Sequence, residues 1–376
     1  MSDLFERLPK YIQIKESLRK DILNGILHEG QQLSSEAELI RRFGASKMTV
    51  IRALQELVQE GFLKRIQGRG TFVTRPASHS LPLGLIVPCT SKGIFPVLIH
   101  EIEKEAHQMG YHIIICCSDD DIKKVENFAR RCICDHVAGV IATPMDRLPN
   151  PFLNRGWYDI FQEAEIPVVL LDRRIKGIDN ANSIETNNED IMITFTRELI
   201  KLGHKRILLA HWKQVQNSAI SSRIRGFHKG ASSGKERLEV AEVIQVCDRQ
   251  PYEDSVRQFE RVIQQYQPTA VMTVCDHIAL HVMNLFKQVK GKPDDTISIT
   301  GFGDLPFSEW IDLATVHQPL DQMGKKAVQL LHECIQGNKV GSMTIPSHIV
   351  YRASLTNINL KQQAVLHNME QSFYSL

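Results

Sequence analysis

The chain has 376 residues, of which 43% are hydrophobic and 23% charged, and this composition excludes a disordered or fibrous protein. Its length predicts two or three domains. The net charge of +2 is uninformative by itself, but residues 1–78 hold 13 Lys and Arg against 9 Asp and Glu, while the remainder holds 32 against 34. The excess of basic residues in 1–78 favours nucleic-acid contact by this segment. Ordinary solvent-exposed charges would give the same modest difference in charge between the two parts of the chain.

The 8 cysteines include no C-x-x-C pair, and most lie in apolar runs such as HIIICC, which predicts buried, reduced thiols. The opening MSDLFERLPKYIQ lacks the apolar segment of a signal peptide. No apolar run approaches the roughly 18 residues that span a bilayer. We therefore expect a cytoplasmic protein with no metal, no cofactor and no membrane contact.

The first 74 residues predict three helices followed by a hairpin. Apolar residues at helical spacing mark a helix over 11–23. Ser35 and Glu38 form a capping box that begins a second helix, and Gly44 ends it. Ser46 caps the third helix, which ends near Gly61. Because only two residues separate the second and third helices, they must cross steeply.

That crossing projects the first turn of the third helix outward, and its exposed residues are candidates for reading DNA: Ser46, Lys47, Met48, Thr49 and Arg52. Phe62–Ile66 and Thr71–Thr74 predict two short strands around the turn Gln67-Gly68-Arg69-Gly70. Glycines on both sides of Arg69 expose a cation at the tip, as a minor-groove or phosphate contact requires. A winged helix-turn-helix that binds DNA is predicted; a three-helix domain for protein contacts is the alternative.

The segment from ILNGILHEGQQL to GRGTFV resembles the DNA-binding domain of the GntR family without gaps, and its wing is most similar to the HutC-type branch. The resemblance implies DNA contacts at Ser35, Glu36, Lys47, Thr49, Gln67 and Gly68. Lys47 and Ile51 stand where the family usually has arginines. Lys cannot make the bidentate hydrogen bonds to a guanine edge that Arg makes. We therefore expect recognition of the DNA sequence to depend more on Thr49, Arg52 and Arg69.

After residue 82, short apolar runs alternate with segments whose apolar residues recur at helical spacing. The predicted strands are Gly84–Val87, His112–Cys116, Val137–Ala142, Pro167–Leu171, Arg206–Ala210, Val240–Val246, Ala270–Thr273 and Ile297–Thr300. Amphipathic segments between them include Val97–Met109, Asp190–Leu202, Ser255–Tyr266 and Leu320–Ile335. This alternation predicts an α/β body with parallel sheets and helices on both faces.

Ligands in such folds bind at the carboxyl ends of strands. The polar residues expected there are Asp172, Arg223, Asp276, Asp304 and Gln318. One arginine with several carboxylates and an amide suits a neutral, polyhydroxylated ligand, although Asp276 could instead cap its helix. No G-x-S-x-G, H-E-x-x-H or P-loop occurs, so no catalytic residue is expected and the chain is not predicted to be an enzyme.

The body resembles the effector domain of the LacI family, which is similar to periplasmic sugar-binding proteins. The resemblance rests on segments in the family's order: IPVVLLDRR, SSRIRGF, TAVMTVCDHIALHVM, ISITGFGD and LATVHQPLDQMGKKAVQLL. It implies two subdomains joined by three crossovers, a ligand between them, and a homodimer. It places pocket residues at Asp172, Arg223, Cys275 and Gln318, with Lys92 to Phe95 in the first loop.

A GntR head on a LacI-like body is the architecture of arabinose-repressor-type regulators. The expected domains are a winged helix-turn-helix over 1–75, a linker over 76–81, an effector domain over 82–356 and a tail over 357–376. The expected function is a repressor of carbohydrate-utilisation genes that binds palindromic operator DNA as a homodimer and responds to a monosaccharide. An activator, a regulator co-repressed by another ligand, and a sugar-binding component are the alternatives.

Overall fold

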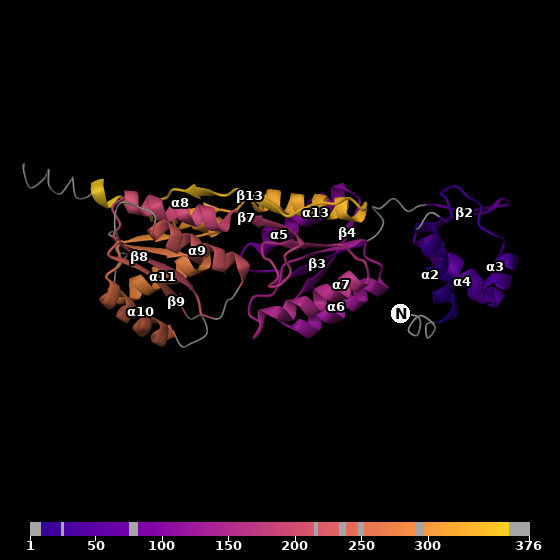
Figure 1. The fold of residues 1–376 in the computed structure, drawn as a ribbon, viewed down its shortest axis with the longest axis horizontal. Helices are drawn as coiled ribbons and strands as arrows, with labels where there is room; N and C mark the ends of the chain where they lie inside the picture. Colours follow the sequence, from indigo (N-terminus) through magenta and orange to yellow (C-terminus); the bar gives the residue numbers. More distant parts are fainter. Residues whose placement is uncertain are drawn as a thin grey trace, which may run out of the picture. The chain divides into compact units, whose positions relative to one another are not determined.

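The computed structural model describes residues 9–23, 26–74, 82–213, 217–232, 238–246, 252–290 and 297–360. The density of internal contacts divides the chain into two units, residues 1–82 with 106–112 and residues 83–105 with 113–376. We call residues 9–74 the head and residues 82–360 the body (Figure 1). The expected linker over 76–81 and the tail beyond 360 lie outside the described residues.

The head contains helices α2 (Lys10–Leu23), α3 (Glu36–Phe43) and α4 (Lys47–Gln59), then strands β1 (Leu63–Ile66) and β2 (Gly70–Val73). The Ser35 capping box is present, since Glu38 N donates to Ser35 Oγ and the Glu38 carboxylate accepts from the Ser35 backbone. Gly44 ends α3 in the left-handed conformation, with φ 55°. The Ser46 cap is also present. The predicted three helices and hairpin are therefore confirmed.

One apolar cluster holds the head together. Its centre is formed by fully buried side chains of α2, α4 and β1, among them Ile14, Leu18, Leu54 and Leu57. The hairpin is antiparallel and pairs Leu63 with Val73. Burying one face of each helix leaves the first turn of α4 and the hairpin tip exposed.

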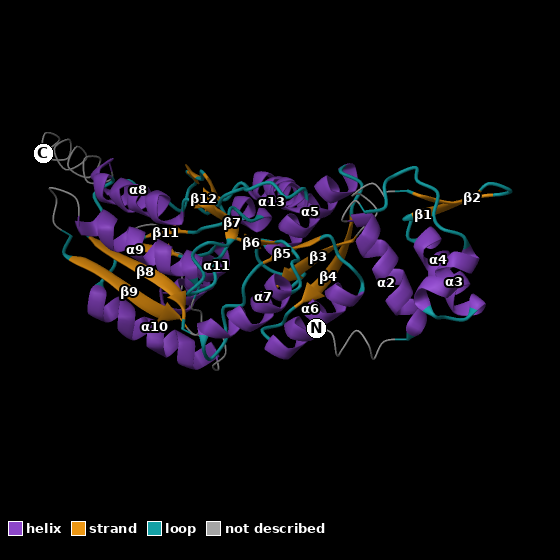
Figure 2. Ribbon diagram, turned by 45° about the vertical axis from the view of Figure 1, so that its right-hand side comes forward, coloured by secondary structure: helices purple, strands orange, loops and turns teal. Residues whose placement is uncertain are grey.

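The body consists of two lobes, each built on a sheet with helices on both faces (Figure 2). The first lobe has six strands in the order β13-β7-β6-β5-β3-β4. Their bounds are β3 (Pro82–Val87), β4 (His112–Cys117), β5 (Gly139–Ala142), β6 (Val168–Leu171), β7 (Asn182–Thr186) and β13 (Met343–Ile345). The pairings from β13 through β3 are parallel, so the carboxyl ends of those strands lie at one edge.

The second lobe has four strands in the order β11-β10-β8-β9, all paired in parallel. Their bounds are β8 (Arg206–Trp212), β9 (Val240–Val246), β10 (Ala270–Thr273) and β11 (Ser298–Thr300). Two further strands, β12 (Thr315–His317) and β14 (His348–Val350), pair antiparallel beside it. The mixed α/β fold with parallel sheets is confirmed.

The first-lobe helices are α5 (Phe95–Gln108), α6 (Ile122–Cys134), α7 (Asn154–Glu163) with the 3₁₀ turn η2 (Pro151–Leu153), and α13 (Leu320–Ile335). The second-lobe helices are α8 (Asn188–Lys201), α9 (Ser218–Ser232), α10 (Tyr252–Tyr266), α11 (Asp276–Lys290) and α12 (Pro306–Trp310). None of the helices in the described part of the chain has the length and apolarity needed to cross a membrane.

The chain passes between the lobes three times, as the resemblance implied. It leaves the first lobe after β7, returns between β12 and α13, and leaves again between β13 and β14. Each lobe has its own apolar core, centred on Trp157 and Phe161 in the first and on Phe195 and Phe227 in the second. Two separate cores connected by three chain crossings are the arrangement found in proteins whose lobes close by hinge motion.

Candidate functional site

In the head, the first turn of α4 is exposed to solvent, as expected for the second helix of a helix-turn-helix. Ser46, Lys47 and Met48 are exposed, and Thr49 is half-buried. Ser46 Oγ lies 2.7 Å from Thr49 Oγ1 and accepts from Thr49 N, so both hydroxyls are partly occupied by capping. The turn therefore offers an ammonium group and a thioether to a partner.

Arg52 follows one turn later on α4, and the structure turns its guanidinium back toward the head. Its Cζ lies 3.8 Å from the centroid of the Tyr11 ring, and its Nε lies 3.4 Å from Glu56 Oε1. The side chain is still 61% exposed. Arg52 can reach a phosphate by giving up these contacts, but it is not presented as a base reader.

The hairpin tip is built as the sequence indicated. Gln67, Gly68 and Arg69 are exposed, and Gly68 has a φ of 74°, which a residue with a side chain adopts only at a cost. Gln32 Nε2 donates to the Arg69 carbonyl at 3.0 Å and fixes the turn. The neighbouring Glu36 accepts from Arg65 Nη2 at 2.6 Å, so this carboxylate is neutralised by the wing. The tip presents the Arg69 side chain outward.

In the body, Arg223 on α9 and Asp172 after β6 are buried residues of different lobes whose charges influence each other. Arg223 is 6% exposed and Asp172 is 4% exposed. Burial lowers the pKa of Arg223 to about 10, and the charge of Asp172 partly offsets this. The guanidinium therefore stays charged at neutral pH and is electrostatically coupled to the Asp172 carboxylate.

Three contacts fix the Arg223 guanidinium. Nε donates to Asn188 Oδ1 at 2.8 Å, Nη1 donates to the Val274 carbonyl at 2.6 Å, and Cζ lies 3.5 Å from the Phe302 ring centroid. Among the residues that the structure describes, Nη2 makes no hydrogen bond. The group is thus held in one orientation by contacts that do not use Nη2.

Asp172 complements this donor with an acceptor. It has a φ of 67°, and its Oδ2 lies 3.4 Å from Arg173 Nε. Its Oδ1 is buried and has no hydrogen-bond partner in the described part of the chain. A buried carboxylate oxygen without a partner costs free energy unless a donor bonds to it, and a ligand hydroxyl or a water molecule is such a donor.

Gln318 joins the same region through the crossovers. It is 2% exposed, and its Nε2 lies 3.4 Å from Thr186 Oγ1 at the end of β7. Asn188, at the start of α8, donates from Nδ2 to the Thr186 carbonyl at 3.2 Å. A connected set of polar groups therefore runs from Arg223 through Asn188 and Thr186 to Gln318, where the chain crosses between the lobes.

Other predicted residues surround this set. Phe95 is buried, with Arg173 Cζ 5.7 Å from its ring centroid, and Lys92 is exposed in the preceding loop. Cys275 is half-buried, and burial raises the pKa of its thiol to about 11, so it is a neutral thiol at physiological pH. Burial lowers the pKa of the nearby His277; the charge of Asp276 opposes this, and the charge of Lys92 adds to it.

Two further predicted carboxylates, Asp276 and Asp304, bond to residues of the second lobe. Asp276 is fully buried; it accepts from Leu305 N at 2.8 Å and from Thr315 Oγ1 at 2.5 Å. Burial raises its pKa. Asp304 accepts from Arg352 Nη2 at 2.8 Å and lies 2.9 Å from His317 Nδ1. Their oxygens are engaged within the protein.

The sequence analysis did not single out a further group of polar residues that bond to one another between the lobes. Arg173 is 9% exposed and contacts Asp146 Oδ2 at 3.0 Å, and Asn217 Nδ2 of the second lobe donates to the same oxygen at 3.1 Å. Arg174 N donates to Ser218 Oγ at 2.7 Å, again across the lobes. A pocket of about 410 Å³ lies here, lined by residues of both lobes. Only the acid–base run after PVVLL signalled this site in the sequence.

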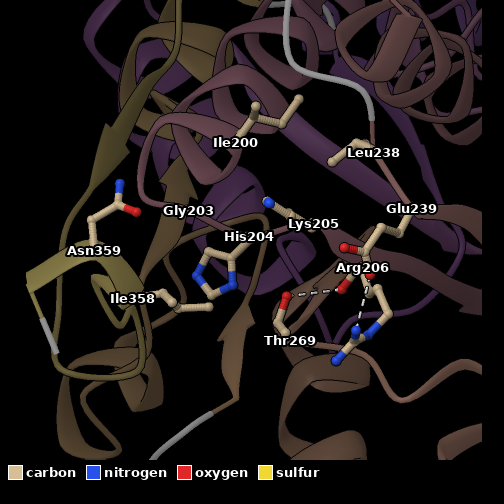
Figure 3. A pocket seen from close by; sticks show the side chains of 10 residues that line it. All are labelled: Ile200, Gly203, His204, Lys205, Arg206, Leu238, Glu239, Thr269, Ile358 and Asn359. Atoms are coloured by element: carbon tan, nitrogen blue, oxygen red, sulfur yellow. Dashed lines mark hydrogen bonds and ion pairs between the residues drawn. The ribbon is translucent and has the colours of Figure 1, made fainter. Parts of the chain in front are cut away.

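A second pocket, of about 670 Å³, lies at the amino ends of the second lobe's strands (Figure 3). Its charged lining is partly neutralised, because Arg206 Nη1 lies 3.0 Å from Glu239 Oε2 and Arg206 Nε donates to the Gln267 carbonyl. It contains none of the predicted effector residues. Among the described residues no group of His, Cys, Asp and Glu side chains is arranged to hold a metal ion.

The chain resembles known regulators along most of its length. It is 26% identical over 358 residues to the arabinose metabolism transcriptional repressor of Geobacillus stearothermophilus, covering 93% of this chain and 96% of that protein. It is 24% identical over 299 residues to the ribose operon repressor of Halalkalibacterium halodurans, covering 77% and 85%.

A solved structure shows the same fold as the body. It is the periplasmic binding protein/LacI transcriptional regulator from Alkaliphilus metalliredigens complexed with D-xylulofuranose, with a TM-score of 0.60 and 24% identity over 73% of this chain and 98% of that one. Residues 10–73 match the family of bacterial regulatory proteins called gntR, and residues 196–355 match the periplasmic binding protein-like domain. The chain therefore joins a GntR-type helix-turn-helix domain to a periplasmic-binding-protein-like domain.

Proposed function

We propose that the chain is a transcriptional repressor of carbohydrate-utilisation genes, controlled by a monosaccharide that binds between the two lobes of the body. The main observation in favour of a monosaccharide effector is the pair of Asp172 and Arg223. It presents a buried acceptor oxygen and a preorganised donor nitrogen, each without a protein partner among the described residues. Hydroxyl groups both donate and accept, so a polyhydroxylated ligand satisfies both atoms.

The nature of the matched proteins supports this assignment. The relatives named above are repressors of arabinose metabolism and of a ribose operon, and the solved structure holds a five-carbon sugar. Repression rather than catalysis is therefore the activity that we assign to this chain. A pentose is the leading candidate for its effector.

We assign the ligand contacts to Asp172, Arg223, Asn188 and Gln318, with Phe95, Cys275 and Lys92 around them. Phe95 is a buried aromatic side chain next to the polar groups, and an aromatic face suits the C–H face of a sugar ring. Asp276 and Asp304 hold the loop after β11 in place. Asp276 bonds to Leu305 and Thr315, and Asp304 bonds to Arg352 and His317.

The head supplies the DNA contacts in this proposal. The exposed first turn of α4 enters the major groove, and Arg69 at the hairpin tip contacts the backbone or the minor groove. We assign residues 1–75 to this domain and residues 82–356 to the effector domain. The protein acts in the cytoplasm as a homodimer, which would match the two halves of a palindromic operator.

Thermal denaturation of the full chain with a panel of pentoses and hexoses tests the effector site. At a sugar concentration 100 times Kd, binding to the folded state alone contributes about 2.7 kcal/mol, so at least one pentose should raise Tm by several degrees. Arg223→Ala should abolish that rise, and so should Asp172→Asn, which preserves the shape of the side chain.

The matched control is Arg225→Ala. Arg225 lies on the same helix, but its side chain is 57% exposed and pairs with Glu189. This variant should keep the full sugar-dependent rise. A rise that persists in both Arg223→Ala and Asp172→Asn would remove the Asp172–Arg223 pair from the ligand site.

A further inference from the structure

The first turn of α4 carries a side chain whose exposure the DNA-binding assignment does not by itself explain. Met48 is 74% exposed, more than Ile26 at 64% and Ile66 at 37%, the other large apolar side chains exposed on the head. Its neighbours on the same turn are the exposed Ser46 and Lys47. An exposed apolar side chain on the turn that faces DNA gains free energy if it is buried against an apolar group of the partner.

The polar side chains of this surface are engaged elsewhere. The Ser46 and Thr49 hydroxyls bond to each other at 2.7 Å. The Arg52 guanidinium stacks on Tyr11 and contacts Glu56. These contacts leave Lys47 and Met48 as the side chains that project from the turn, and Lys47 carries a compact charge suited to a phosphate rather than to a base edge.

The chemistry of the major groove then limits what Met48 can recognise. Base edges present hydrogen-bond donors and acceptors there, and the C5-methyl group of thymine is the apolar group among them. A thioether side chain is flexible and polarisable, so it adapts to an apolar contact of this size. We propose that Met48 reads a thymine methyl group in each half of the operator.

This inference rests on the proposed function, since it requires that the head bind a specific DNA sequence. It adds that specificity at one position of the half-site is set by an apolar contact. Arg52 has no part in reading that position, although the sequence analysis counted it among the main readers.

The experiment begins with the full-length protein and a pool of random duplexes, from which the preferred operator is selected. Each thymine of the selected half-site is then replaced in turn by deoxyuridine, which removes only the methyl group. Loss of one buried methyl contact is worth about 0.8 kcal/mol, or roughly a fourfold rise in Kd per half-site. We expect one position at which wild-type protein shows this rise.

Combining Met48→Ala with the deoxyuridine duplexes completes a double-mutant cycle between the side chain and the methyl group. This substitution should raise Kd for the thymine operator by a similar or larger factor, and the variant should bind the thymine and deoxyuridine duplexes equally well. Ile26→Ala is the control, because it removes an exposed apolar side chain of the same head outside α4. It should retain the wild-type response to deoxyuridine. Unchanged Tm values would show that both variants are folded.

Two results would overturn the inference while leaving the DNA-binding proposal intact. One is a selected operator in which no deoxyuridine substitution weakens wild-type binding. The other is a deoxyuridine effect that persists in Met48→Ala. If no sequence is enriched from the pool at all, sequence-specific DNA binding itself fails, and the inference fails with it.

Discussion

At the scale of single residues, Asp304 shows how neighbouring charges set the ionisation of a partly buried carboxylate. Burial by itself would raise the pKa of its carboxyl group, but the hydrogen bonds and charges of Arg352 and His317 outweigh this, and the pKa lies below the ordinary 3.8. The ionised form is therefore favoured in the folded protein. Its stabilising contribution is present above about pH 4 and is lost as the pH falls through the folded-state pKa.

Asp304→Asn should consequently lower Tm at pH 7, and the difference from wild type should shrink as the pH is lowered from about 4 toward 3. Thermal denaturation across this range measures both quantities. Asp159→Asn is the matched control, because Asp159 makes an exposed pair with Arg155 on one helix and should change Tm little at any pH. A deficit of Asp304→Asn that stays constant down to pH 3 would show that its ionisation is not what stabilises the loop.

The sequence indicates where such residues lie but not what they contact. Asp172, Asp276 and Asp304 all follow apolar runs, and the structure places them after or beside strands as expected. Of these three, Asp172 alone has a buried oxygen without a hydrogen-bond partner among the described residues. Asp276 bonds to Thr315 and Asp304 bonds to Arg352, which are 39 and 48 residues distant in sequence. Periodicity and spacing carry no information about such long-range partners.

At the scale of secondary-structure elements, the close approach of α8 and α9 depends on glycines of the SSRIRGF segment and beyond. A Cβ atom at Gly226 would clash with the Glu189 carbonyl and lie 2.8 Å from Met192 Cβ, and one at Gly230 would lie 2.7 Å from Thr196 Cβ. Because the Glu189 carbonyl belongs to the backbone of α8, it cannot move aside as a flexible side chain would. The position of Arg223, three residues before Gly226 on the same helix, depends on this contact.

Gly226→Ala should therefore destabilise the body by about 1–3 kcal/mol, despite the better helix propensity of alanine. The Tm of the full chain measures the effect. Gly156→Ala is the control, since that glycine also lies in a helix but faces only the carboxylate end of Glu126 at 3.3 Å. We expect it to be neutral or slightly stabilising. An equal Tm for the two variants would contradict the proposed role of the α8–α9 contact.

The elements that the sequence predicts best are those with strong local signals. The capping box, the Gly44 terminator and the strands Val240–Val246 and Ala270–Thr273 lie where local chemistry places them. The strands missing from the sequence analysis are β7, β12, β13 and β14, which have five residues or fewer. β7 reads NSIET, and β13 leaves Met343 and Thr344 exposed. Their pairing is decided by the lobes around them rather than by apolar periodicity.

At the scale of the whole molecule, the crossovers join the two lobes between which we place the effector site. Arg223, Asn188, Thr186 and Gln318 form a polar path that runs through two of the three crossings. A ligand that bonds to Asp172 in one lobe and Arg223 in the other favours one arrangement of the lobes over another. Control of DNA binding then requires that the two arrangements differ in operator affinity.

The overall plan of two functions in one chain was predictable, because each half carries an ordered series of specific segments. The identity of the effector was not, because it depends on which polar atoms remain unoccupied after folding. The same holds for operator preference, since the contact of Arg52 with Tyr11, 41 residues earlier in the chain, cannot be read from local sequence.

The most direct test of the central claim is the affinity of the full-length protein for its selected operator, measured by fluorescence anisotropy with and without each pentose at saturation. We expect the pentose that raises Tm to increase the operator Kd by roughly 5–150-fold, the range that corresponds to a coupling free energy of 1–3 kcal/mol. Arg223→Ala should bind the operator normally and show no such increase. An operator Kd that is unchanged, or lowered, by every sugar that binds the protein would contradict the account.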